Sequence, residues 1–175
     1  SKIALIIKEK VDGSLKLRFV LDLLRSGQNG QMTVPERVVL PRAIDFVNGT
    51  VDLLQVEWDT PDQSGADDMG VELLTMDFAD AFYTVWLREK DRGSLVFRTV
   101  GGWAVFLRLC FGMAGAPLVW GRIAAGGCRI SQACFSPSEL RVQCYVDDPA
   151  VAARGSPTIR LELFAKLLLL WSILG

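Results

Sequence analysis

The sequence contains no histidine among its 175 residues. This absence excludes acid–base catalysis by imidazole, the Ser-His and Cys-His nucleophile systems, and most zinc sites. Four cysteines are present, Cys110, Cys128, Cys134 and Cys144, but none forms a Cys-x-x-Cys pair. Their spacing indicates neither a zinc knuckle nor a redox motif, and we interpret them as buried thiols in a reducing compartment.

Long apolar runs and a strong net charge are also missing. The longest apolar run, residues 167–174, is too short to cross a bilayer, so we expect no membrane partner. The thiols expected in a reducing compartment suit an intracellular protein, cytoplasmic or nuclear. The length of 175 residues predicts one domain, or one and a fraction, and the half of the residues that are apolar predict a sizeable core. The net charge of −1 divides into +3 over residues 1–50, −7 over 51–100 and +3 over 101–175. Basic flanks around an acidic centre suit an anionic ligand held with metal ions, although ordinary surfaces also show such patterns.

The N-terminal part predicts a basic β-hairpin. Two apolar runs, at residues 3–7 and 15–21, flank Asp12-Gly13, a dipeptide typical of hairpin turns. The hairpin carries four cations: Lys8, Lys10, Lys16 and Arg18. These cations either protect an exposed strand edge or form a flap over a phosphate-bearing substrate.

The segments that follow are less regular. Residues 25–35 are rich in Gly, Asn and Gln and predict a loop. A helix is expected from about Pro41, and Asn48-Gly49 predicts that it is broken or divided in two. Residues 57–70 are polar and acidic and predict a surface insertion.

Two places combine strand-like patterns with carboxylates. Residues 71–77 form an apolar run that ends in Asp77 and predicts a central strand buried on both faces, where an unpaired carboxylate is costly. Asp80 follows at a helix start and could be a simple cap. Residues 141–151 predict a strand, a two-residue acidic turn of Asp147 and Asp148, and a returning strand. That turn is either a solvated acidic turn or half of a metal site, because a divalent cation would relieve the repulsion.

The remaining elements connect these places. Residues 94–99 and 103–109 are strand-like and are joined by Gly101-Gly102. Small residues from Gly112 lead through Pro117 into a helix over residues 118–131, and residues 157–174 predict a final amphipathic helix.

The order of these motifs resembles the fingers and palm of a reverse transcriptase from a retroelement, over residues 8–174. The stretches VPERVVLPR and AGAPLVWGR are similar to retroelement polymerases of dinoflagellates. The resemblance implies an α+β palm: an antiparallel sheet with helices on one face, plus a fingers hairpin. It implies fingers at 1–56, the insertion at 57–70, and a palm at 71–175 that stops before the primer grip and thumb.

The resemblance also implies the chemistry and its residues. Two magnesium ions, which manganese can replace, would be held by Asp77, the main-chain carbonyl of Phe78 and Asp147, with Asp148 completing the cluster. They would assist an in-line attack of a primer 3′-hydroxyl on a deoxynucleotide.

Further roles are implied around this centre. Phe82 would exclude a 2′-hydroxyl, although it could be a core phenylalanine. The main-chain N–H groups of Asp80 and Ala81, with Lys10 and Arg18, would bind the triphosphate, with Lys8 competing for the place of Lys10. Gly112 would let the template or nucleotide approach the backbone, and Tyr145 would lie near the primer terminus.

Two alternatives stay open: an RNA-dependent RNA polymerase, and a palm that binds nucleic acid without polymerising. Val146 before the acidic pair, the short Asp77–Asp80 interval and Phe82 favour DNA synthesis. Cys110-Phe111 and Pro149 depart from the usual pattern without touching a ligand. The expected partners are a template with its primer, deoxynucleotides, and a larger polyprotein with thumb, RNase H and integrase.

Overall fold

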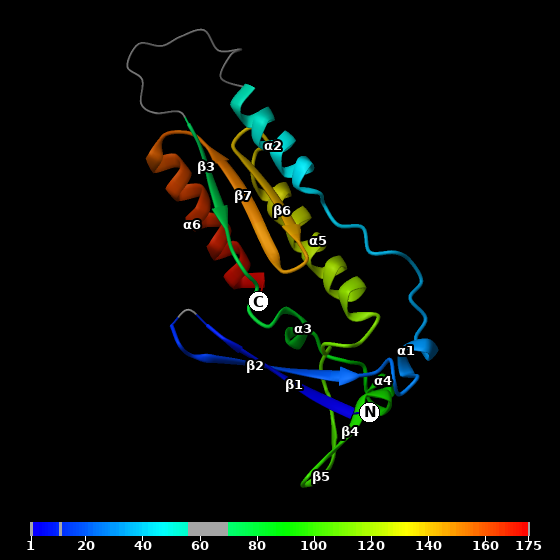
Figure 1. Ribbon diagram of the computed structural model, residues 1–175. Coiled ribbons are helices and arrows are strands. Elements are labelled where there is room, and N and C mark those ends of the chain that lie inside the picture. The colour runs from blue at the N-terminus through cyan, green and yellow to red at the C-terminus, as the bar shows by residue number, and fades with distance from the viewer. Residues whose placement is uncertain (1, 11, 56–69, 175) are drawn as a thin grey trace, which may run out of the picture. The chain divides into compact units, whose positions relative to one another are not determined.

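A computed structural model describes residues 2–10, 12–55 and 70–174, so most of the predicted insertion at 57–70 lies outside the described residues (Figure 1). The strands are β1 (Lys2–Glu9), β2 (Leu15–Asp22), β3 (Val71–Thr75), β4 (Val96–Thr99), β5 (Gly102–Val105), β6 (Leu140–Tyr145) and β7 (Asp148–Arg154). The helices are α1 (Gln28–Gln31), α2 (Ala43–Gln55), α3 (Ala81–Thr84), α4 (Glu89–Arg92), the 3₁₀ turn η1 (Gly93–Leu95), α5 (Ala116–Cys134) and α6 (Pro157–Leu174). The protein therefore mixes helices and sheets, as predicted.

The chain divides into two compact units. The hairpin unit comprises Ser1–Val38 and Asp80–Trp120, and the sheet unit comprises Val39–Ala79 and Gly121–Gly175. These boundaries differ from the predicted fingers at 1–56 and palm at 71–175. Residues 80–120 join the hairpin because they share its core, whereas α2 packs on the sheet.

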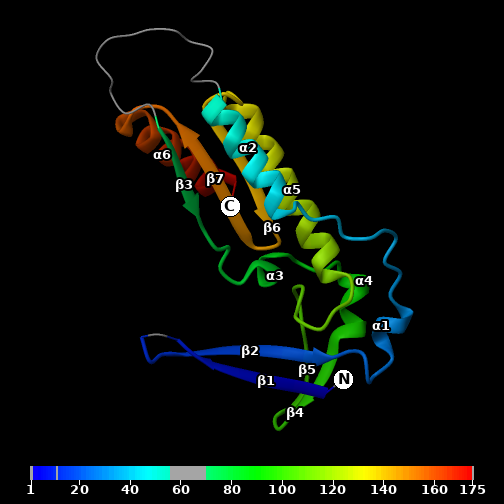
Figure 2. The same ribbon diagram turned by 45° about the horizontal axis from the view of Figure 1, so that its top comes forward.

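The hairpin unit is built on the antiparallel pair β1–β2, which confirms the predicted hairpin (Figure 2). In its register Lys8 lies opposite Lys16 and Ile6 lies opposite Arg18, so the cations Lys8, Lys16 and Arg18 share one strand face. The core of this unit contains Leu21, Leu23, Leu87, Leu95, Leu109, Cys110 and Ala116. The strands β4 and β5 form a second antiparallel pair beside it.

The sheet unit contains a three-stranded antiparallel sheet in the order β3-β7-β6 (Figure 1). The central strand is β7, so the prediction of a central β3 buried on both faces is wrong. Val151, Ala152 and Ala153 of β7 are fully buried because small side chains allow close covering on both faces. In contrast, Leu73 of the edge strand β3 is largely exposed.

Helices cover both faces of this sheet, so the prediction of helices on one face only is wrong. On one face Leu140 and Val142 of β6 pack with Leu163 of α6 in a common core. Side chains alternate along a strand, so Arg141 points to the other face. On that face the Arg141 side chain packs beside Gly49 of α2: a Cβ atom added at Gly49 would lie 3.8 Å from the Arg141 Cγ.

The helix α2 runs unbroken from Ala43 to Gln55, so the predicted interruption at Asn48-Gly49 is wrong. Glycine inside a helix costs about 1 kcal/mol relative to alanine, an amount that packing can offset. Here the fully buried Leu53 anchors the helix. Its start is fixed by Arg42, whose main-chain N–H donates to the Asp45 carboxylate at 2.7 Å.

The final helix α6 occupies the predicted range, with Leu163 and Leu167 buried. It is less amphipathic than predicted, because Leu161 and Ile173 on its other sides are exposed. Among the described residues, no helix combines the length and apolar character that a membrane span needs.

Candidate active site

Asp77 is held beside the β6–β7 turn by hydrogen bonds from both of its neighbours. The main-chain N–H of Met76 donates to the carbonyl oxygen of Pro149 at 3.0 Å, and that of Phe78 donates to the carbonyl oxygen of Asp147 at 2.8 Å. These bonds continue the register in which Thr75 lies opposite Ala150. Asp77 therefore lies opposite Asp148, on the same face of the sheet.

The turn itself differs from the predicted one. Its two central residues are Val146 and Asp147, because Asp148 already belongs to β7 and pairs with Tyr145. Val146 adopts a left-handed φ of 58°. This conformation is strained for a β-branched residue, and such strain is typical of functional turns.

The three carboxylates lie close to the surface rather than in the core. Asp77 and Asp148 are exposed, and Asp147 is partly buried. The expected desolvation cost at Asp77 is therefore wrong, because β3 is an edge strand. Within the described parts of the chain, no arginine or lysine forms an ion pair with any of the three. Their mutual repulsion is thus not relieved by an ion pair among the described residues, since the nearby Arg42 pairs with Asp45.

The oxygen donors here fit a magnesium ion in chemistry and in number, although not as a closed cage. Residues 2–10, 12–55 and 70–174 contain no group of three acidic, cysteine or histidine side chains arranged to hold a metal. Magnesium typically takes only one or two carboxylates, completed by water and substrate phosphates. The facing pair Asp77 and Asp148, with Asp147 and the carbonyl of Phe78 nearby, can supply such ligands.

A cavity of about 400 Å³ lies beside this acidic turn. Asp148, Tyr145 and Gln143 line one side, and the start of α2 lines the other. Tyr145 is 57% exposed. The side-chain oxygen of Gln143 is buried and accepts no hydrogen bond within the described structure.

The residue that follows Asp77 is held by aromatic packing that the sequence analysis missed. The ring of Phe78 lies 5.4 Å from that of Trp171 on α6. The indole N–H of Trp171 donates to the buried Ser131 hydroxyl at 2.7 Å. These contacts anchor Phe78 and thereby the position of Asp77. A single tryptophan in an apolar helix does not indicate such a role from the sequence alone.

Two thiols lie next to the turn. Cys144 of β6 donates to the carbonyl oxygen of Val146 at 3.3 Å. Its hydrogen bond with Cys128 of α5, together with burial and the charges of Cys128, Asp147 and Asp148, raises the pKa of Cys144. The same hydrogen bond lowers the pKa of Cys128.

The predicted phosphate-binding residues lie in the hairpin unit. Arg18 stacks its guanidinium on the ring of Phe111 at 5.4 Å, and its Nε is buried with no hydrogen-bond partner among the described residues. Lys10 is exposed just after β1, where its carbonyl accepts from Gly13 at 2.9 Å. Lys8, within β1, shares the strand face of Arg18.

Asp80, Ala81 and Phe82 follow at the start of α3. Asp80 has a left-handed φ of 52° and caps α3 without a side-chain hydrogen bond, so it is not an ordinary carboxylate cap. Ala81 is buried. The Phe82 ring is partly buried and meets Phe111 edge-on at 5.2 Å, a contact that serves the core of this unit.

Gly112 is required by its own chain. Its φ is 95°, and a Cβ there would collide with the carbonyl oxygen of Leu21. Asn29 holds the same loop with both ends of its amide: Nδ2 donates to the Gly112 carbonyl at 2.8 Å, and Oδ1 accepts from the Ala114 N–H at 3.0 Å. The sequence analysis treated Asn29 only as part of a loop.

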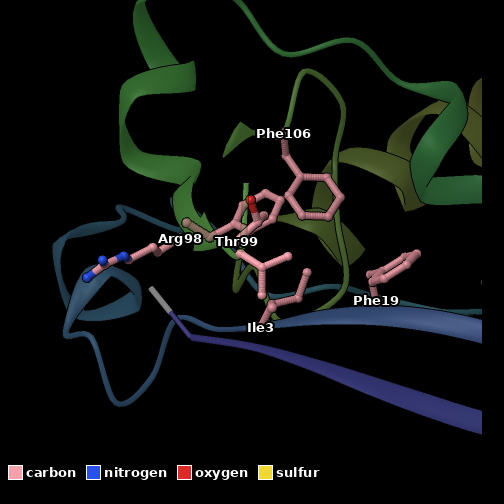
Figure 3. Close-up of a pocket in the computed structure, with 7 residues that line it drawn as sticks. Ile3, Phe19, Arg98, Thr99 and Phe106 are labelled. Atoms are coloured by element: carbon pink, nitrogen blue, oxygen red, sulfur yellow. The ribbon is translucent and has the colours of Figure 1, made fainter. Parts of the chain in front are cut away.

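A larger cavity, of about 750 Å³, lies in the hairpin unit and contains none of the predicted site residues. Phe19, Phe106 and Ile3 line it, and Arg98 extends its guanidinium away from the Phe106 ring (Figure 3). Its lining contains no carboxylate. This cavity therefore offers a cation no carboxylate ligand, unlike the smaller cavity beside the acidic turn.

Comparison with known proteins supports the fold. No family model matches the chain. No curated protein matches it either. Among solved structures it is similar to the protease-reverse transcriptase of prototype foamy virus: to a CSH mutant at 17% identity and a TM-score of 0.62, over 99% of this chain and 19% of that one. The native form matches at 18% identity and a TM-score of 0.56, over 95% of this chain. The protein thus has a reverse transcriptase-like fold and spans about a fifth of those chains.

Proposed function

We propose that this chain is the fingers and palm part of an RNA-directed DNA polymerase, which adds deoxynucleotides to a primer 3′-hydroxyl. The observation that carries the proposal is the pair of hydrogen bonds that flank Asp77 and place it opposite Asp148 at the strained turn. Carboxylates occur both in ion pairs that stabilise a fold and in sites of nucleotidyl transfer. Carboxylates on facing strand ends that form no ion pair favour the second kind of site, which receives metal ions together with its substrate.

In this proposal Asp77, Asp147 and the carbonyl of Phe78 would hold two magnesium ions, and Asp148 would complete the acidic cluster. When bound, these ions would stabilise the charge that develops on the attacking and leaving oxygens. The protein's part is to hold the carboxylates in place: the segment that follows β3 presents Asp77, and the β6–β7 turn presents Asp147. Tyr145 lines the adjacent cavity, which suits a role beside the primer terminus.

The hairpin unit would bind the nucleotide and the nucleic acid. It carries 12 Lys and Arg against 7 Asp and Glu, a net charge of +5, whereas the sheet unit carries 7 against 13, or −6. Arg18 and Lys10 or Lys8 would contact the triphosphate, with the main-chain N–H groups of Asp80 and Ala81. Phe82 would exclude the 2′-hydroxyl, and Gly112 would lie along the template or nucleotide.

The proposed partners are a primed RNA or DNA template, deoxynucleotides, and the remaining domains of a polyprotein, including a thumb, RNase H and integrase. The foamy virus proteins that share the fold are protease-reverse transcriptases, which supports a polyprotein context. A retroelement of the dinoflagellate type stays a prediction from the motif wording.

The alternative is a palm that binds nucleic acid without polymerising. One observation favours it: among the described residues, no three side chains are arranged to hold a metal ion, and a palm that only binds nucleic acid needs no such group. Primer extension separates the two functions. The full chain is incubated with a DNA primer on an RNA template and magnesium, with either deoxynucleotides or ribonucleotides. Extension with deoxynucleotides supports the proposal, and extension with ribonucleotides indicates an RNA polymerase. Binding of the primed template without extension by either indicates the binding-only palm.

A further inference from the structure

We propose that Cys128 and Cys144 form a disulfide when the protein meets a hydroperoxide, which makes this thiol pair an oxidation site beside the acidic turn. The formation of the bond is independent of the polymerase proposal, but its consequence for nucleotide addition rests on that proposal.

The first support is the position of the two cysteines, which line the same cavity and whose thiols interact. Cys128 belongs to α5 and Cys144 to β6, both within the sheet unit, and their thiols are joined by a hydrogen bond. Two thiols in hydrogen-bond contact can be bridged with small movements of the side chains, provided that the Cβ atoms face each other. Both residues also line one cavity of about 190 Å³, through which a small oxidant can reach them.

The second support is the link from Cys144 to the turn. Its single thiol hydrogen can point to the carbonyl oxygen of Val146 at 3.3 Å or to the Cys128 sulfur. When it points to Val146, Cys128 can donate in turn to the Cys144 sulfur. Val146 also lines the shared cavity and carries the left-handed φ of 58° that shapes the turn before Asp147.

The other two cysteines do not share this arrangement. Cys110 is fully buried in the core of the hairpin unit, and burial raises the pKa of its thiol to about 11. Cys134 is exposed at the end of α5. No hydrogen bond joins either of them to another cysteine among the described residues, so both serve as controls.

The chemistry balances with one peroxide. The Cys128 thiolate, favoured by the hydrogen bond that lowers its pKa, attacks a peroxide oxygen. The O–O bond breaks, hydroxide leaves, and Cys128 becomes a sulfenic acid. The Cys144 sulfur then attacks the Cys128 sulfur, the S–O bond breaks, and the departing hydroxide takes up the thiol proton as water. Two thiols lose two electrons, and hydrogen peroxide is reduced to two waters.

The expected consequence is a change at the turn. In the disulfide Cys144 has no hydrogen to donate, so the carbonyl of Val146 loses this partner. The new bond also ties β6 to α5 directly before Tyr145 and the turn. Small displacements of catalytic groups reduce rates strongly, so we expect nucleotide addition to fall by about tenfold or more, with recovery in dithiothreitol.

The test is peptide mapping of the full chain after treatment with hydrogen peroxide, without reduction, for the wild type and the variants C128S, C144S, C110S and C134S. The proposal predicts a cross-linked peptide joining Cys128 to Cys144 in the wild type, C110S and C134S, and none in C128S or C144S. Unreacted thiols, separate sulfinic acids at the two positions, or bridges to Cys110 or Cys134 would overturn it.

This readout needs no polymerase activity, so a failure of the oxidation proposal and a failure of the polymerase proposal are distinguishable. In a chain that extends primers, a mapped Cys128–Cys144 disulfide with an unchanged rate of addition would overturn the link to the turn. Loss of activity that also occurs in C128S would show that oxidation acts elsewhere.

Discussion

The main-chain N–H of Phe78 donates a 2.8 Å hydrogen bond to the carbonyl oxygen of Asp147. This bond joins the end of one strand to the turn between two others, and with the bond from Met76 to Pro149 it places Asp77 opposite Asp148. Two like charges thus face each other, and among the described residues neither forms an ion pair with a lysine or an arginine.

We predict that the variant Asp148→Asn stabilises the metal-free protein. Like charges on facing strand positions destabilise a sheet, so removing one should raise the free energy of unfolding by about 0.5 kcal/mol. Urea denaturation in the presence of a chelator measures this change. The control Asp52→Asn removes a charge from the exposed side of α2 and should change stability little.

In magnesium the wild type should become more stable than Asp148→Asn, because an ion that binds only the folded protein stabilises it. Wild-type protein should gain stability in excess magnesium chloride, and Asp148→Asn should gain less. If Asp148→Asn is less stable than the wild type in chelator, the proposed repulsion is absent.

The backbone of Val146 supports a second prediction. Its φ of 58° is unfavourable for valine but common for asparagine, so Val146→Asn should raise the free energy of unfolding by about 1 kcal/mol. The control Val100→Asn changes a fully exposed valine in the β4–β5 turn and should be neutral. Equal effects at both positions in thermal denaturation would contradict a strained turn.

Much of this architecture could be predicted from alternation and turn residues. The β1–β2 hairpin, the β6–β7 hairpin and α6 lie where their patterns predict, because each pairs local apolar periodicity with a local turn or proline. The position of β3 could not be predicted this way. A five-residue apolar strand looks the same at the centre of a sheet and at its edge, and the small residues of β7 decide which strand is central.

The candidate site could also be predicted only in part, because its geometry depends on how the strands pair. The sequence places Asp147 and Asp148 in one turn, but only the register shows that Asp148 begins β7 and faces Asp77. Asn29 and Trp171 were missed because their partners, Gly112 and Phe78, are 83 and 93 residues away in the chain. Contacts over such distances leave no periodic pattern.

A third prediction concerns Gly112. The variant Gly112→Ala introduces a Cβ that collides with the Leu21 carbonyl at a left-handed φ, so it should lower the free energy of unfolding by about 2 kcal/mol or more. The matched control is Gly126→Ala within α5, where a Cβ meets nothing within 4 Å. It should raise the free energy of unfolding by about 0.5–1 kcal/mol, since alanine favours helix. Similar effects of the two variants in urea denaturation would refute the close approach at Gly112.

A fourth prediction separates the two roles of Phe82. If it excludes the 2′-hydroxyl, Phe82→Val should lower the preference for deoxynucleotides over ribonucleotides by about tenfold or more. The variant should also lose about 1–3 kcal/mol of stability, because the ring packs on Phe111. Phe106→Val is a suitable control, since Phe106 packs in the same core against Phe97 at 5.1 Å. It should lose stability with no change in nucleotide preference. The same loss of preference in both variants would assign Phe82 to packing alone.

A fifth prediction concerns pH. Burial raises the pKa of the Cys110 thiol from 9.0 to about 11, so the folded state favours the protonated thiol. Its contribution to the free energy of unfolding is complete below the unfolded pKa and is lost as the pH rises towards 11. Cys110→Ala should therefore show a shallower loss of stability over this range in urea denaturation. Cys134→Ala, at an exposed position, should keep the wild-type slope. An identical slope in all three proteins would refute the shift at Cys110.

The central claim is that the carboxylates at the β6–β7 turn catalyse nucleotide addition. The most direct test is the rate of adding one deoxynucleotide to a DNA primer on an RNA template in magnesium, by wild type, Asp147→Asn and Asp52→Asn. The account predicts addition by the wild type and by Asp52→Asn, and a loss of at least about a hundredfold in Asp147→Asn. Addition by Asp147→Asn at the wild-type rate would contradict it, as would bound primed template with no addition by any of the three.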